Sequence, residues 1–304
     1  MLVSIATTLI TESAYAGLDV EANPTNMADV PGHAFETLNR LEPAATIGAT
    51  YFTPGKVKTD KDVEVTQVQS YFNVPLTGGG DEDGWIYFVG LNFSENEFRV
   101  SDTKSGADAK QRLYDITVPL TLFRQADAET AYVAYIAPGL RSSLEYVGDE
   151  DFGGDVIFQV VKDKGIHSYQ YGAGIITAFG ESQLVPVVSY SYQPNSQLNV
   201  TLGLPTFVDY AVSESQSYFA RLTPNGGQWH AYDGNKKDNG FDYKQEGFRF
   251  GGGGEWQLFG PLYLELEAGV QFGQKVTYKE RGQEVTAKFD PSNYINASLN
   301  IYFD

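Results

Sequence analysis

The fold follows from one stretch near the end of the chain, Asn293 to Phe303, which reads NYINASLNIYF. Apolar side chains take alternate positions, at Ile295, Ala297, Leu299, Ile301 and Phe303. The positions between them hold polar groups, at Tyr294, Asn296, Ser298, Asn300 and Tyr302. A period of two predicts a β-strand with one apolar and one polar face. The apolar face must meet a second sheet in a soluble sandwich or lipid in a membrane barrel.

Two earlier segments repeat the alternation. From Leu262 to Phe272, aliphatic residues alternate with Glu265 and Glu267, and from Phe248 to Leu258 apolar residues and glycines alternate with more polar positions. From Ala44 onward, segments of this kind are separated by Gly, Pro, Asn and Asp clusters, and they number about fourteen. The sequence therefore predicts an all-β meander without a long helix.

Strand length and loop length favour a barrel over a sandwich. The clearest segments approach the roughly 9 to 11 residues that a tilted strand needs to cross a bilayer. The connections Gln193–Ser196 and Phe259–Pro261 are short, whereas Pro224–Gly240 and Gln274–Asp290 are long. Such asymmetry, with aromatic residues near strand ends, is typical of membrane barrels. We expect an antiparallel, up-and-down transmembrane β-barrel of about 12 to 14 strands over residues 44–304.

Composition excludes several classes of protein. The 304 residues contain no cysteine, so disulfides and cysteine-ligated metal sites are excluded. No apolar run approaches the roughly 20 residues of a membrane-spanning helix. The net charge of −18 argues against a nucleic-acid partner, because phosphate contacts need clustered Lys and Arg.

The first residues resemble a secretory signal. Residues 1–10 are moderately apolar, and Ala14-Tyr15-Ala16 forms a small-residue cleavage pattern. The usual basic residues before the apolar part are missing, which is expected of a truncated signal. We expect a signal peptide at 1–16, followed by a periplasmic lead-in at 17–43.

The polar register of the strands carries charges that we expect to line the barrel interior. A charge on the lipid face would cost a few kcal/mol at the bilayer midplane. We expect Glu265 and Glu267 to be balanced by Arg221 and Arg249 across the wall. The predicted lumen-lining charges are Asp115, Arg141, Glu145, Arg221, Arg249, Glu255, Glu265 and Glu267.

Catalysis, a cofactor and a metal site are not predicted. A serine hydrolase needs a histidine beside its serine. Of the three histidines, His33 lies in the lead-in, His230 is assigned to a loop, and His167 adjoins Ser168 on the opposite face of a strand. No phosphate loop or metal-ligand spacing occurs. The glycines at 251–254 lie inside a strand, where they would allow curvature or leave room in the lumen.

The chain resembles the outer-membrane β-barrels of Gram-negative bacteria. Residues 184–192, LVPVVSYSY, followed by 198–205, are similar to the central segment of a family of outer-membrane barrels of unknown function. The resemblance implies outer-membrane lipid as the surroundings. It also implies insertion by the barrel-assembly machinery, which reads a final aromatic strand, here ending at Tyr302 and Phe303. Asp304 departs from the usual terminal aromatic residue.

We therefore expect a non-catalytic barrel in the outer membrane, acting as a narrow channel or as a structural or binding barrel for a cargo that the sequence does not name. Two alternatives stay open. A lipid-modifying barrel hydrolase would bring His167 or His230 within about 3 Å of a serine hydroxyl. A soluble, exported β-sandwich that binds a ligand would pack its apolar faces against each other.

Overall fold

The computed structural model describes residues 45–302, except 59–61, 82–83, 103, 105, 233–239 and 281–282. The predicted signal peptide at 1–16, the lead-in at 17–43 and Phe303 lie outside the described residues. Within the described part, no helix is both long and apolar enough to cross a membrane.

The described chain is built almost entirely of strands, with one 3-10 turn at Asp149–Asp151. The strands are β1 (Ala45–Lys56), β2 (Val63–Gly80), β3 (Trp85–Asp102), β4 (Ala107–Thr117), β5 (Leu120–Gln125), β6 (Thr130–Ser142), β7 (Phe152–Asp163), β8 (His167–Ile176), β9 (Gln183–Tyr192), β10 (Leu198–Leu202), β11 (Thr206–Ser213), β12 (Gln216–Pro224), β13 (Gly227–Tyr232), β14 (Gly240–Phe259), β15 (Leu262–Glu280), β16 (Gln283–Lys288) and β17 (Ser292–Ile301).

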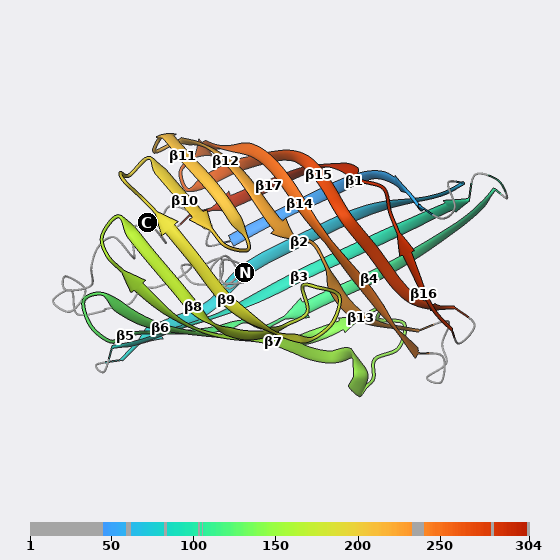
Figure 1. Cartoon of the computed structure of the whole chain (residues 1–304), viewed down its shortest axis with the longest axis horizontal. Helices are drawn as coiled ribbons and strands as arrows, with labels where there is room; N and C mark the ends of the chain where they lie inside the picture. Colours follow the sequence, from blue (N-terminus) through green and yellow to red (C-terminus); the bar gives the residue numbers. More distant parts are fainter. Residues whose placement is uncertain are drawn as a thin grey trace.

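These strands form one closed antiparallel barrel (Figure 1). The sheet closes where β1 pairs with β17, from Ala45 opposite Ile301 to Phe52 opposite Tyr294. Three barrel strands are interrupted, so that two segments together make one strand of the barrel. β4 and β5 both lie between β3 and β6. In the same way, β12 and β13 both pair with β14, and β16 and β17 both pair with β15. Seventeen segments thus make 14 barrel strands, and the predicted up-and-down barrel is confirmed.

The outer surface of the barrel is apolar, and its interior is polar. In β17, Ile295 is 61% exposed, whereas Tyr294 and Asn296 are 1% and 4% exposed. The neighbouring strands repeat this, with Leu266 exposed and Glu267 buried on β15. Aliphatic side chains that point outward around a closed wall fit a lipid environment. The sandwich alternative is wrong, because the apolar faces do not pack against a second sheet.

The wall is much taller on one side than on the other. We call the end with Ala45 and Ile301 the proximal end and the opposite end the distal end. The long strands β2, β3, β14 and β15 run well past the short hairpins of β8 to β12 (Figure 1). The distal extension closes on itself, because β13 pairs in parallel with the end of β6, His230 opposite Ser142.

Two predicted loops are largely strand in this extension, so those predictions were wrong. The expected loop 224–240 contains β13, and the expected loop 274–290 contains the end of β15 and all of β16. In β13 the two-faced pattern is hidden, because five of its six residues are buried on both faces. In β15 and β16, Lys and Glu alternate with Val276, Tyr278 and Val285, and the charges were mistaken for a loop signal.

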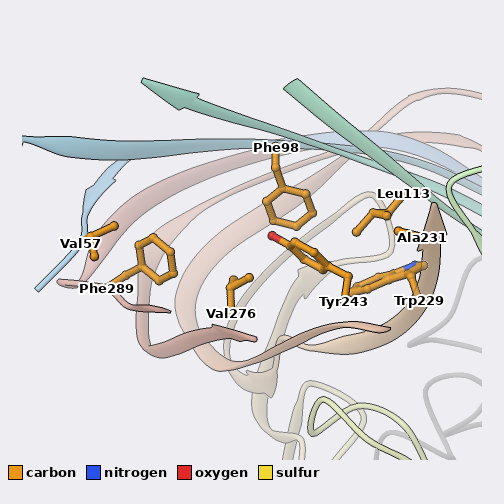
Figure 2. Packing of buried hydrophobic residues seen from close by; sticks show 8 residues of the cluster. All are labelled: Val57, Phe98, Leu113, Trp229, Ala231, Tyr243, Val276 and Phe289. Atoms are coloured by element: carbon orange, nitrogen blue, oxygen red, sulfur yellow. The ribbon is translucent and has the colours of Figure 1, made fainter. Parts of the chain in front are cut away.

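The distal extension is filled with apolar side chains. Phe98 of β3 and Leu113 of β4 face Trp229 and Ala231 of β13 and Tyr243 of β14 (Figure 2). Val57, Val276 and Phe289 complete the cluster. We call these eight residues the distal plug, because their side chains occupy the barrel axis where an open pore would contain water.

Candidate functional site

Below the distal plug, the barrel contains a cavity of about 720 Å³ that is lined by both charged and apolar side chains. It is lined from β1 to β4, β6, β7, β10 to β15 and β17, and it reaches exposed residues of the proximal turns, among them Ser196, Gln197 and Glu214. Its volume is within the roughly 300 to 1,000 Å³ of typical ligand sites. The cavity therefore lies inside the apolar-coated part of the wall and extends to the proximal end.

Seven of the eight predicted lumen charges line this cavity, namely Asp115, Arg141, Arg221, Arg249, Glu255, Glu265 and Glu267. Glu145 does not. β6 ends at Ser142, so Glu145 lies in the following loop with its side chain exposed. The prediction for Glu145 extended the strand alternation beyond the point where the strand ends.

Arg221 is the centre of one ion cluster. Its guanidinium pairs with Glu265 and Glu267, and its Nε donates to Oε2 of Glu267 at 3.0 Å. It also lies over the ring of Phe219, 4.4 Å from the centroid. Tyr294 donates its hydroxyl to the other oxygen of Glu267. The cluster thus joins β12, β15 and β17 across the interior.

Arg141 is the centre of a second cluster. Its Nε donates to Asp115 at 3.0 Å, and its Nη2 donates to Asp155 at 2.7 Å. Thr177 contacts the same guanidinium, and its backbone N–H donates to Asp155 at 2.9 Å. Arg141 is only 9% exposed, so these partners are needed to offset the loss of water around its charge.

Glu255 is held by neutral donors. Nδ2 of Asn300 and the hydroxyl of Tyr302 each donate to Oε1 of Glu255 at 2.8 Å. Tyr302 therefore points into the lumen rather than toward lipid. Its ring meets Tyr263 edge-on, with centroids 4.9 Å apart.

Glycines make room for these side chains. A Cβ at Gly251 would collide with the hydroxyl of Tyr294 and lie 2.6 Å from Oε1 of Glu267. At Gly253 it would lie 2.8 Å from the ring of Phe219. Both glycines face inward, so the glycine run in β14 provides space in the lumen for the Arg221 cluster.

Amide side chains separate the cavity from the distal plug. Nε2 of Gln245 donates to Gln67 at 3.2 Å, and Nε2 of Gln67 donates to Asn96 at 3.1 Å. Nearby, Nδ2 of Asn225 donates to Gln271 at 2.8 Å. Along the axis the interior therefore changes from charged, to amide-lined, to apolar.

One side of the interior is apolar. Inward residues of β6 to β9 pack into a cluster that includes Tyr135, Ala137, Ile157, Val185 and Val187. Tyr135 and Ala137 also line the cavity. The cavity thus has a charged wall facing an apolar wall, which sequence alternation does not distinguish.

Two acidic residues of the cavity were missed by the sequence analysis. Asp209 lies between Val208 and Tyr210, which point outward, so its place in the polar register was readable from the sequence. Asp155 shares its register with Ile157, a buried apolar residue, so no alternation signal identifies it. Its position follows from β7 crossing from the apolar wall to the Arg141 cluster.

His167 and His230, the histidines within the described residues, do not form a hydrolase site. Nδ1 of His167 bonds the hydroxyl of Tyr190 at 2.8 Å. His230 places Nδ1 3.0 Å from Asp242 and Nε2 3.1 Å from Glu150. Within the described residues, no contact joins either ring to a serine hydroxyl, and no group of His, Asp and Glu has the arrangement of a metal site.

A closed 14-strand barrel with an apolar outer surface and a charged interior defines the class: this is a membrane β-barrel protein. The chain belongs to the family described as Domain of unknown function (DUF6268), whose model matches residues 45–304. That family is consistent with the uncharacterised barrel family that residues 184–205 resemble.

The chain is also similar to several solved structures, all of low sequence identity. The COG4313 outer membrane channel of Pseudomonas putida F1 is 15% identical, with 85% of this chain and 96% of that chain covered and a TM-score of 0.43. A deltaS2 mutant of the TodX monoaromatic hydrocarbon channel is 11% identical, with 90% and 93% covered and a TM-score of 0.42. The transport unit of the autotransporter AIDA-I of Escherichia coli is 13% identical, with 93% and 97% covered and a TM-score of 0.31. No curated protein sequence matches the chain.

Proposed function

We propose that the protein is a non-catalytic channel of the Gram-negative outer membrane, with a narrow, charged lumen that the distal plug closes. The observation that carries this proposal is the cavity of about 720 Å³, lined by charges inside the apolar-coated wall and extending to the proximal end. A charged interior inside lipid is costly unless it serves a solute or water path. The proximal end would face the periplasm.

The distal plug implies a closed resting state. Phe98 and Tyr243 pack with centroids 5.2 Å apart across the axis, and Trp229 adds a further ring against Tyr243. Water does not pass through a close-packed apolar core. Opening requires the plug side chains, or β13 with its parallel pairing to β6, to move.

Planar-bilayer recording of the full-length protein tests the proposal. We expect small or rare conductance steps from the wild type. The double variant Phe98→Ala/Tyr243→Ala, which removes the aromatic rings of two plug residues, should give larger or more frequent steps. Val270→Ala is the matched control, because Val270 faces outward and is 39% exposed. If neither the wild type nor the plug variant conducts, while both show the heat-dependent gel mobility of a folded barrel, the channel proposal is overturned.

A further inference from the structure

We propose that the cavity selects small organic cations that carry N–H donors, such as alkylammonium ions. This rests on the proposed function, because it names the solute class of that lumen. The cavity lining contains seven carboxyl groups and three guanidinium groups, an excess of four acidic side chains. The carboxylates belong to Asp115, Asp155, Asp209, Glu214, Glu255, Glu265 and Glu267, and the guanidinium groups to Arg141, Arg221 and Arg249.

The three arginines are already engaged with the protein. Arg141 pairs with Asp115 and Asp155, and Arg221 pairs with Glu265 and Glu267. Arg249 lies over the ring of Tyr294, 5.8 Å from the centroid. The interior therefore has little positive charge to offer an anionic solute, and the carboxylate excess remains.

Oxygen atoms without a protein partner gather in the same cavity. Five buried side-chain oxygens that line it accept or donate no hydrogen bond within the described part of the chain: Thr46 Oγ1, Asn92 Oδ1, Asn199 Oδ1, Asp209 Oδ2 and Asn300 Oδ1. Thr46, Asn199 and Asn300 are at most 7% exposed. Four of the five oxygens can only accept, so a ligand that satisfies them must donate.

The strand register places two carboxylates that form no salt bridge within the described part of the chain, those of Asp209 and Glu255, beside these acceptors. Asn199 lies directly opposite Asp209 in the β10–β11 pair, so both side chains project inward from one place on the wall. Asn300 contacts Glu255, whose hydrogen-bond donors Asn300 and Tyr302 are both neutral. Neither Asp209 nor Glu255 has a salt bridge with an arginine or lysine among the described residues.

An aromatic ring adds a contact suited to a cation. Phe219 lies opposite Asp209 in the β11–β12 pair, and Arg221 already lies over the ring of Phe219. A cation over an aromatic face gains roughly 0.5 to 2 kcal/mol in proteins. Ammonium groups have three donors and no acceptor, which matches the acceptors around Asp209 and Glu255. Two such positions in one cavity suit a diammonium ion.

Equilibrium dialysis of the full-length protein in detergent tests the inference without requiring conduction. The probes are three four-carbon molecules of similar length: putrescine, 1,4-butanediol and succinate. We expect saturable binding of putrescine, weakened severalfold by raised salt, and no binding of the diol or the dicarboxylate. Asp209→Asn and Glu255→Gln should each lower the affinity for putrescine about fivefold or more, whereas Glu129→Gln, at an exposed turn residue outside the cavity, should not.

The inference is overturned if putrescine does not bind, if succinate binds as well, or if Glu129→Gln weakens binding as much as the cavity variants. Heat-dependent gel mobility shows which variants are folded. If only one of the two cavity variants folds, that variant alone is enough for the test. The two proposals fail separately. Putrescine binding without conductance overturns only the channel, and conductance without putrescine binding overturns only the cation selectivity.

Discussion

Nε of Arg221 on β12 donates to Oε2 of Glu267 on β15 at 3.0 Å, and this ion pair spans β14 inside the barrel. Glu267 is 7% exposed, so its charge depends on Arg221 and Tyr294 for compensation. The pair therefore links three consecutive strands of the wall through the lumen.

Removing the arginine alone should destabilise the barrel. In Arg221→Met, Glu265 and Glu267 are left close together without their cation, and breaking one side of a buried pair costs about 3 kcal/mol. The triple variant Arg221→Met/Glu265→Gln/Glu267→Gln removes both signs and should recover much of this loss. Urea unfolding in detergent measures the difference. If the triple variant is as unstable as the single one, uncompensated charge is not the cause.

The lumen glycine Gly251 should not tolerate a methyl group. In Gly251→Ala, the new Cβ must displace the hydroxyl of Tyr294 and the carboxylate of Glu267. Overpacking of this kind costs about 2 kcal/mol. Gly153→Ala on β7 is the matched control, because no other heavy atom lies within 4 Å of its added Cβ. Thermal loss of the compact gel form compares them, and equal midpoints would show that the lumen repacks freely.

The barrel and its charged interior were predictable from the sequence because both depend on a period of two. The outward residues from Ile295 to Ile301 of β17 and from Leu262 to Phe272 of β15 are apolar, so Glu265, Glu267 and Asn300 could be assigned to the lumen before the fold was known. The same reasoning misplaced Glu145, since alternation does not say where a strand ends.

The distal plug was not predictable in the same way. Its members Trp229 and Ala231 lie on β13, where residues of both faces are buried, so the alternation that marks membrane strands is lost. The parallel pairing of Ser142 with His230 joins residues far apart in sequence. Such a contact depends on the whole barrel and has no local pattern.

An outward ion cluster should make the distal extension sensitive to acid. The rings of Phe72 on β2 and Phe93 on β3 stack on each other, and Glu97 follows them along β3. Glu97 pairs with Lys110 at 2.5 Å, Arg99 at 2.6 Å and Arg112 at 3.1 Å. Aromatic rings followed by charges mark the level where the wall leaves lipid.

These ion pairs lower the pKa of Glu97 to about 2, and the hydrogen bond with Lys110 has the largest effect. A lowered pKa means that the contribution to stability is complete above the unfolded-state pKa of about 4.3 and is lost as the pH falls toward 2. Because the cationic partners are half exposed, Glu97→Gln should cost only about 1 kcal/mol at pH 7. Most of the difference from wild type should be lost near pH 2.

Unfolding in urea at pH 7 and near pH 2 measures this convergence. Glu284→Gln, at an exposed carboxylate on the distal strand β16, serves as the control for a simple change of net charge. A Glu97→Gln deficit that is the same at both pH values would contradict the ionic origin of the effect. A deficit equal to that of Glu284→Gln would show that the cluster contributes nothing specific.

The closing strand provides the last prediction, which concerns assembly rather than stability. The resemblance to outer-membrane barrels implies that Tyr302 and Phe303 end the strand that the barrel-assembly machinery recognises, and the hydroxyl of Tyr302 also donates to Glu255 in the lumen. Tyr302→Phe removes only that hydrogen bond, so we expect normal insertion in cells. Deletion of residues 302–304 should lower the amount of heat-modifiable protein in the outer membrane severalfold, yet leave refolding in detergent largely intact, because no assembly machinery acts there. If refolding of the deletion variant in detergent falls as much as its insertion in cells, the assembly interpretation is wrong. Residues 302–304 would then be needed for barrel stability, through the pairing of β17 with β1 and β15.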